Sequence, residues 1–233
     1  MIDRTRTARI VGVLFIMASA LAIVGGSLVA PFGEDGFVSS LASDRAQVVS
    51  GVILELALGV TVIAIAAMIL PILREGGEGL ASWYLGVRVV EGALVAVAAS
   101  CALVGVTLSE TFGVSGAAGI DPVADALVST REWAYLVGTM VVFGVSAVIL
   151  NAVLYRTVLV PRWISVWGLI GAVLLLVSAA LELYGSDPST TVQAVLAAPI
   201  AINEMVLAVW LIARGFAGPR VQAERGSVVG ASN

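Results

Sequence analysis

Residues 48–73 read VVSGVILELALGVTVIAIAAMILPIL, and Glu55 is the one charged residue in this stretch. A helix over these residues would be about 39 Å long at about 1.5 Å per residue, which exceeds the hydrocarbon core of about 30 Å. Apolar and polar residues do not alternate with a period of two, which excludes a membrane-spanning strand. The stretch therefore predicts a transmembrane helix.

Five further apolar runs have the length that a membrane helix needs, about 20 residues. They cover residues 10–30, 80–108, 133–155, 163–184 and 192–213. The first run is longer than the apolar region of a signal peptide, and Leu28 is a poor residue at the −3 position of the cleavage site that would follow Ala30. We therefore predict an all-α polytopic membrane protein, a bundle of six transmembrane helices.

The composition supports lipid as the main partner of this chain. Hydrophobic residues make up 60% of the sequence, charged residues make up 12%, and the mean hydropathy is +1.07. An ordinary soluble domain has about 25% charged residues. The chain has no lysine and no basic patch with interleaved aromatic residues, so nucleic acid is not an expected partner.

The absence of histidine removes the commonest metal ligand and the commonest general base. The single cysteine, Cys101, lies in an apolar run and is interpreted as a small buried residue. We find no motif for a metal or for a cofactor, and we expect neither.

Arginine placement predicts the orientation. The N-terminus, two alternate loops and the C-terminal tail hold nine arginines, whereas the intervening loops hold Arg45 and Arg131. Because basic residues accumulate on the cytoplasmic side, we expect a bacterial plasma membrane protein with both termini in the cytoplasm. We expect residues 1–217 to form a single transmembrane domain and residues 218–233 to form a disordered cytoplasmic tail.

The longest loop between apolar runs covers residues 109–132. Asp121-Pro122 resembles a helix N-cap followed by proline at the first helical position, which predicts a short helix ending at Val128 on the outer membrane surface. Ser129-x-x-Glu132 resembles a capping box, so we expect a new helix to begin there.

Several polar residues interrupt the apolar runs. Because a charge at a helix centre costs at least about 2.5–3.5 kcal/mol on insertion scales, such residues are expected to face the bundle interior and to find partners. Glu55 and Glu182 are interpreted as protonated or snorkelling side chains. The candidate site consists of Arg88, Glu91, Asn151, Asn203 and Glu204.

Arg88 and Glu91 are spaced i, i+3 and share a helix face. Helix length places Glu91 and Glu204 both roughly 15 Å from the cytoplasmic side, which predicts that Arg88 contacts one of them. Gly92, Ala96 and Ser100 continue the face of Arg88 with small residues, so another helix should approach closely there.

Three functions remain open at this point. The polar cluster is a site for a small molecule, an ion, a proton or a lipid; or it only fixes helix packing in a structural or accessory protein; or its carboxylates perform acid–base catalysis. No nucleophile stands beside a base and no Asp-rich motif occurs, which disfavours an enzyme. The sequence leaves the oligomeric state open.

Several short stretches of the sequence stand in a distinctive order: ARIVG (8–12), RVVE (88–91), VPRW (160–163), INE (202–204), AVWLI (208–212) and RG (214–215). In this order and spacing they resemble a bacterial family called domain of unknown function 4386. The family usually has an aromatic residue before the arginine of the third helix, where this chain has Val87. The resemblance implies an uncharacterised multi-pass membrane protein, and it implies no substrate or cofactor.

Overall fold

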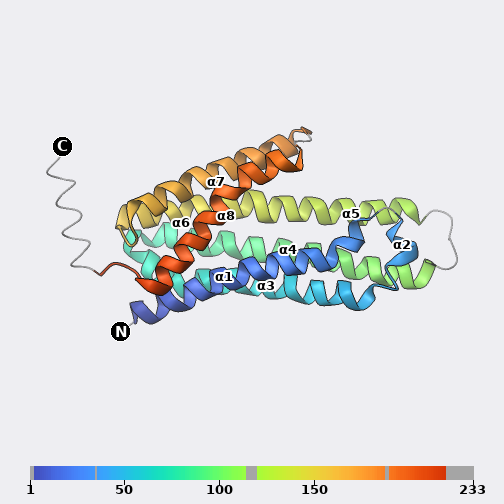
Figure 1. Ribbon diagram of the computed structural model, residues 1–233, viewed down its shortest axis with the longest axis horizontal. Helices are drawn as coiled ribbons and strands as arrows, with labels where there is room; N and C mark the ends of the chain where they lie inside the picture. Colours follow the sequence, from blue (N-terminus) through green and yellow to red (C-terminus); the bar gives the residue numbers. More distant parts are fainter. Residues whose placement is uncertain (1–2, 35, 114–119, 187–188, 219–233) are drawn as a thin grey trace. The chain divides into compact units, whose positions relative to one another are not determined.

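The computed structural model describes residues 3–34, 36–113, 120–186 and 189–218, and the described chain consists of helices and short connections, without strands (Figure 1). The predicted all-α fold class is therefore confirmed. The elements are α1 (Arg4–Val29), η1 (Ala30–Gly33), α2 (Phe37–Ser40), α3 (Arg45–Leu73), η2 (Arg74–Gly76), α4 (Glu78–Phe112), α5 (Asp121–Leu136), the π-helical η3 (Val137–Val142), α6 (Phe143–Thr157), α7 (Arg162–Leu183) and α8 (Thr190–Ala213).

Six helical segments in the described chain are long and apolar enough to cross a membrane. Each segment contains one of the six predicted apolar runs completely, except that the run 163–184 extends one residue beyond its segment. The chain is therefore a multi-pass, membrane-embedded protein. The segments are Arg4–Gly33, Arg45–Gly76, Glu78–Phe112, Asp121–Thr157, Arg162–Leu183 and Thr191–Ala213.

One predicted boundary is wrong. A helix does begin at Asp121, but it does not end at Val128, because α5 runs on to Leu136 and continues through η3 into α6. No glycine or proline follows Pro122 until Gly138, so nothing in this stretch ends the helix. The hydroxyl of Thr130 donates to the carbonyl of Ala126 at 2.7 Å, as expected inside a continuous helix. The segment 129–132 is therefore helix interior.

The described chain forms two compact units. Unit 1 comprises residues 1–16, 64–88 and 140–233, and unit 2 comprises residues 17–63 and 89–139. Each unit is described by itself. Of the predicted tail 218–233, all but Gly218 lies outside the described residues.

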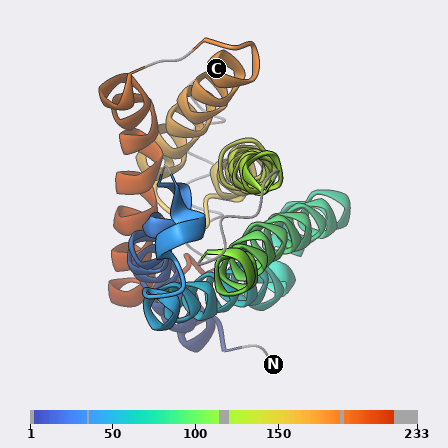
Figure 2. The ribbon, with the colours of Figure 1, turned by 90° about the vertical axis from the view of Figure 1, so that its right-hand side faces the viewer.

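In unit 2, glycines allow neighbouring helices to approach closely, and the helical segments run lengthwise beside one another (Figures 1 and 2). A Cβ atom added to Gly92 of α4 would lie 2.9 Å from the carbonyl oxygen of Gly59 of α3. The close approach predicted beside Gly92 is thus confirmed. A second contact joins α1 and α3, where a Cβ on Gly51 would lie 2.9 Å from the carbonyl oxygen of Gly25.

In unit 1, α6, α7 and α8 pack together around Ala147, Ala172, Leu175 and Ile200. A Cβ added to Gly171 of α7 would lie 2.7 Å from the backbone nitrogen of Ile200, directly after Pro199 in α8. The two ends of the described chain also meet in this unit, because Arg4 donates a hydrogen bond to the carbonyl oxygen of Ala217 at 3.0 Å.

We predict that Gly171→Ala destabilises the protein by about 1–3 kcal/mol, because the added methyl group meets backbone atoms that cannot move aside without separating α7 from α8. Thermal unfolding of the purified protein in detergent measures the effect. Gly86→Ala in α4 is the matched control, since its Cβ would enter open space. A loss of stability in the control equal to that of Gly171→Ala would contradict the packing argument.

Candidate functional site

Two groups of buried polar residues lie in the membrane-spanning helices, one in each unit. Glu55 is fully buried, and Arg88, Glu91, Asn151 and Asn203 are each at most 6% exposed. Because burial in hydrocarbon removes water as a hydrogen-bond partner, the pairing of each group decides what it can do.

In unit 2, the carboxylate of Glu55 in α3 accepts two hydrogen bonds from the guanidinium of Arg131 in α5. The Nη2···Oε1 and Nη1···Oε2 distances are 2.5 Å and 3.0 Å. Nη1 of Arg131 also donates to the carbonyl oxygen of Ala98 in α4, at 2.7 Å. This two-pronged geometry is the strongest form of the arginine–carboxylate pair.

An aromatic ring adds a further interaction to the Arg131 guanidinium. The guanidinium carbon lies 5.5 Å from the ring centroid of Tyr135, one helical turn further along α5. Among the described residues, no buried nitrogen or oxygen of Glu55 or Arg131 is left without a hydrogen-bond partner. We therefore interpret this ion pair as a structural link between three helices.

This pair corrects two expectations. The interpretation of Glu55 as a protonated or snorkelling residue is wrong, because Glu55 accepts two hydrogen bonds from the partly buried Arg131. Arg131 is not in a loop, because the capping-box pattern at Ser129 lies inside α5. A sequence signal was present: Glu55 is a carboxylate within an apolar run, and it required a cation on a neighbouring helix.

Unit 1 contains a different arrangement, a small cavity of about 10 Å³. Three helices supply its polar lining. They contribute Tyr84 and Arg88 from α4, Ser146 and Asn151 from α6, and Asn203 and Glu204 from α8, and Phe143, Ala147, Leu150, Ile200 and Leu207 complete the wall. On each helix the lining residues recur from one turn to the next, which brings these side chains to one face.

Arg88 lies beside aromatic rings. Its guanidinium carbon is 5.5 Å from the ring centroid of Phe143 and 5.9 Å from that of Tyr84. Arg88 is 2% exposed, so the ring faces replace part of the hydration that its charge has lost.

The two asparagines are oriented by hydrogen bonds to helix carbonyls. Nδ2 of Asn151 donates to Ala147 at 2.9 Å, and Nδ2 of Asn203 donates to Ile164 of α7 at 2.8 Å. Because a carbonyl can only accept, these bonds fix which end of each amide is nitrogen. The Oδ1 atoms of both residues are buried and accept no hydrogen bond from the described protein.

Helix α7 supplies no lining residue, but it positions both amides. A Cβ on Gly168 would overlap the side-chain amide of Asn151, so only glycine fits at that position. The carbonyl of Ile164, one turn earlier, holds Asn203.

The structure thus gathers most of the predicted site residues around one cavity: Arg88, Asn151, Asn203 and Glu204. Glu91 is buried in unit 2 and does not line this cavity. A contact of Arg88 with Glu91 or Glu204 stays a prediction. Sequence reasoning missed Tyr84, Ser146 and Gly168, which carry no charge to draw attention. Among the described residues, no group of three or more acidic, histidine or cysteine side chains is placed to hold a metal ion.

We predict that Glu55→Gln and Arg131→Met each destabilise the protein by about 3–5 kcal/mol, because either change leaves a buried group without its partner. The double variant Glu55→Gln/Arg131→Met should recover much of this loss, since no unpaired charge remains. Thermal unfolding of the single and double variants measures the coupling. Losses that simply add in the double variant would show that the two side chains act independently.

The family model described as domain of unknown function (DUF4386) matches residues 10–215. No curated protein and no solved structure matches the chain. The matched region runs from α1 to just beyond α8 and includes every residue that lines the unit 1 cavity. It covers well over half of the chain, and the chain therefore belongs to the DUF4386 family of domains of unknown function.

Proposed function

We propose that the unit 1 cavity is an intramembrane proton-binding site, in which Glu204 carries the proton and a single water molecule completes the hydrogen bonds. The observation that carries this proposal is the pair of unsatisfied amide oxygens, on Asn151 and Asn203, beside Arg88 and Glu204. A buried cluster that served packing alone would gain stability from satisfying these acceptors within the protein.

Size limits the occupant. Sites for small molecules usually enclose about 300–1,000 Å³. The cavity of about 10 Å³ matches the space that one water molecule needs. A metabolite is therefore far too large, and the remaining candidates are a water molecule, a small ion and a proton.

Charge narrows the choice further. An anion would meet the two amide oxygens of Asn151 and Asn203, which carry partial negative charge and disfavour it. Water suits the site, because its two hydrogens match the two free acceptors. A proton suits the site as well, because Glu204 is the one carboxyl group in the lining and is half-buried.

A second candidate is a structural or accessory membrane protein. The fully paired link between Glu55, Arg131 and Ala98 in unit 2 favours it, because that cluster has no unsatisfied group to offer a ligand. The two functions make different demands on Glu204: proton binding needs its carboxyl group, whereas packing tolerates a neutral side chain of the same shape.

We predict that Glu204 gains and loses a proton in the folded protein, so that difference infrared spectra between acid and alkaline pH contain a carboxylic acid band that Glu204→Gln abolishes. Glu182→Gln is the matched control, since Glu182 is a half-buried carboxyl group of α7 outside the cavity. A band that persists in Glu204→Gln, or that disappears only in Glu182→Gln, would refute the proposal and favour the accessory function.

We also propose that the protein lies in the bacterial plasma membrane with both termini in the cytoplasm. The excess of arginines at the termini and alternate loops supports this orientation. The position of Arg131 inside α5, where it pairs with Glu55, supports it further. Among the described residues, Arg45 at the first position of α3 then remains as the single arginine at the opposite helix ends, and it pairs with Glu110 of α4.

This orientation predicts opposite labelling of two introduced cysteines in a Cys101→Ala background. A cysteine in place of the exposed Asp125 should react with a membrane-impermeant reagent in intact cells, and a cysteine in place of Asn233 should react only after lysis. Reaction of both cysteines from the same side would contradict the six-span topology, and the reversed pattern would contradict the orientation.

A further inference from the structure

The outward face of α8 forms an open, apolar groove of about 410 Å³, independent of the cavity described above. The groove is lined along its length by Ile202, Met205, Val206, Val209 and Trp210, and Arg214 lies at its end. Every lining residue comes from α8 or from its C-cap, Arg214. Ile202 and Val209 are 51% and 60% exposed, so in the described part of the chain no other helix covers this face.

We propose that this groove binds a phospholipid with an anionic headgroup, with one acyl chain along the apolar face and the phosphate at Arg214. The length fits one leaflet of the membrane. Twelve residues separate Ile202 from Arg214, about 18 Å of helix, and half of a hydrocarbon core is about 15 Å.

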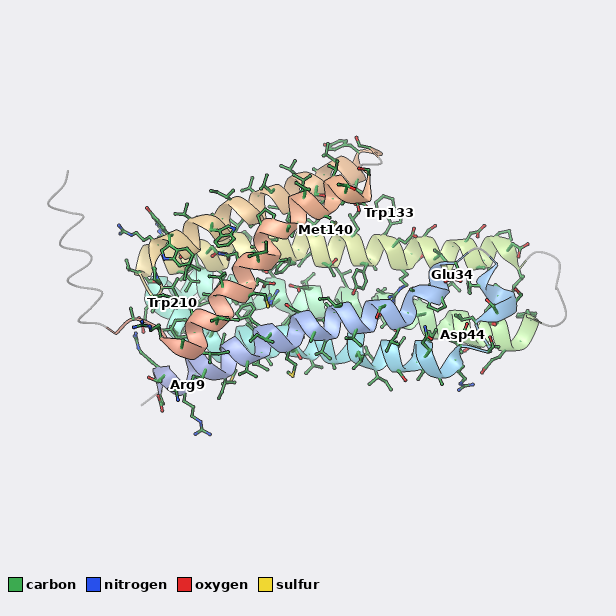
Figure 3. The ribbon with its side chains drawn as sticks, in the orientation of Figure 1. Arg9, Glu34, Asp44, Trp133, Met140 and Trp210 are labelled. Carbon is green, nitrogen blue, oxygen red and sulfur yellow. The ribbon has the colours of Figure 1, made fainter. Side chains whose placement is uncertain are left out.

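The chemistry changes along the groove as it does along a lipid. The first two turns, from Ile202 to Val209, are lined by isoleucine, methionine and valine side chains. Trp210 then lies in the last turns of α8 (Figure 3), and tryptophan is typical of the boundary between hydrocarbon and headgroups. Arg214 follows one turn later, it is exposed, and among the described residues it forms no salt bridge. Its guanidinium can donate two parallel hydrogen bonds to a phosphate.

Arg214 is essential to this proposal because it lies at the C-terminal end of α8. The last carbonyl groups of a helix carry a partial negative charge, which by itself disfavours an anion at the C-terminus of α8. The positive charge of Arg214 reverses that preference. A headgroup without net charge gains less from the arginine, so the site should distinguish anionic from zwitterionic lipids.

A second copy of the chain fits the groove less well. Two copies related by an axis along the membrane normal would place their α8 helices in parallel, and their Arg214 side chains would repel each other at the same depth. Helix dimers in membranes also favour small residues at the contact, whereas the groove is lined by isoleucine, methionine and valine.

Native mass spectrometry of the full-length protein tests the proposal. The protein is released from detergent after incubation with phosphatidylglycerol or phosphatidylcholine that have identical acyl chains. The wild type should retain phosphatidylglycerol preferentially. Arg214→Gln should weaken retention of phosphatidylglycerol about fivefold and leave phosphatidylcholine unchanged, since one basic residue near an anionic surface contributes about that factor.

Arg156→Gln is the matched control, because Arg156 is an exposed arginine in the last turn of α6, outside the groove. This variant should keep the wild-type preference. A second variant, Val209→Trp, fills the apolar groove and should reduce retention of both lipids. Equal retention of the two lipids by the wild type, or an equal loss in Arg156→Gln and Arg214→Gln, would overturn the proposal. A dimer that Val209→Trp dissociates would assign the groove to a second copy instead.

Discussion

A charged group inside hydrocarbon persists only when protein groups replace the water that it has lost. Glu55 meets this requirement with Arg131, and three helices contribute to the pair: α3 the carboxylate, α5 the guanidinium and α4 the carbonyl of Ala98. The planar guanidinium accepts a narrow range of orientations, so the pair fixes these helices at one level. Gly59 lies one turn beyond Glu55, where a Cβ atom would lie 3.2 Å from the carbonyl oxygen of Gly92 in α4. The ion pair and the backbone contact therefore specify the same register.

Unit 1 meets the same requirement without complete pairing. The aromatic rings of Tyr84 and Phe143 lie beside the Arg88 charge, and the donors of both asparagines are used on helix carbonyls. The Oδ1 atoms of both asparagines therefore remain without a hydrogen-bond donor in the described protein. Helix α7 maintains this arrangement, because Gly168 leaves room for the Asn151 amide and the carbonyl of Ile164 binds Asn203. The two asparagine side chains are thus oriented by a helix that does not itself line the cavity.

Lipid imposes a composition that can be recognised from sequence, which is why the predicted run 163–184 differs from α7 by one residue at each end. The four-residue capping pattern at Ser129 predicts a helix start and places Arg131 in a loop, whereas no helix-breaking residue stands between Pro122 and Gly138 and α5 continues through this segment. The π-helical turn η3 contains no proline from which it could be predicted. Asn151, Asn203 and Glu204 were predictable as polar residues in apolar runs. Their meeting at one cavity depends on how α4, α6 and α8 pack, and Gly168 has a role only in that packing.

The polar residues that line the unit 1 cavity are not equally enclosed. Asn151 and Asn203 are 2% and 0% exposed, whereas Glu204 is half-buried. Glu204 is therefore the least enclosed polar residue of the lining. In the proposed proton site, a proton would enter at the Glu204 carboxyl group, which it neutralises. The more enclosed amide oxygens of Asn151 and Asn203 would hold the water molecule that completes the hydrogen bonds.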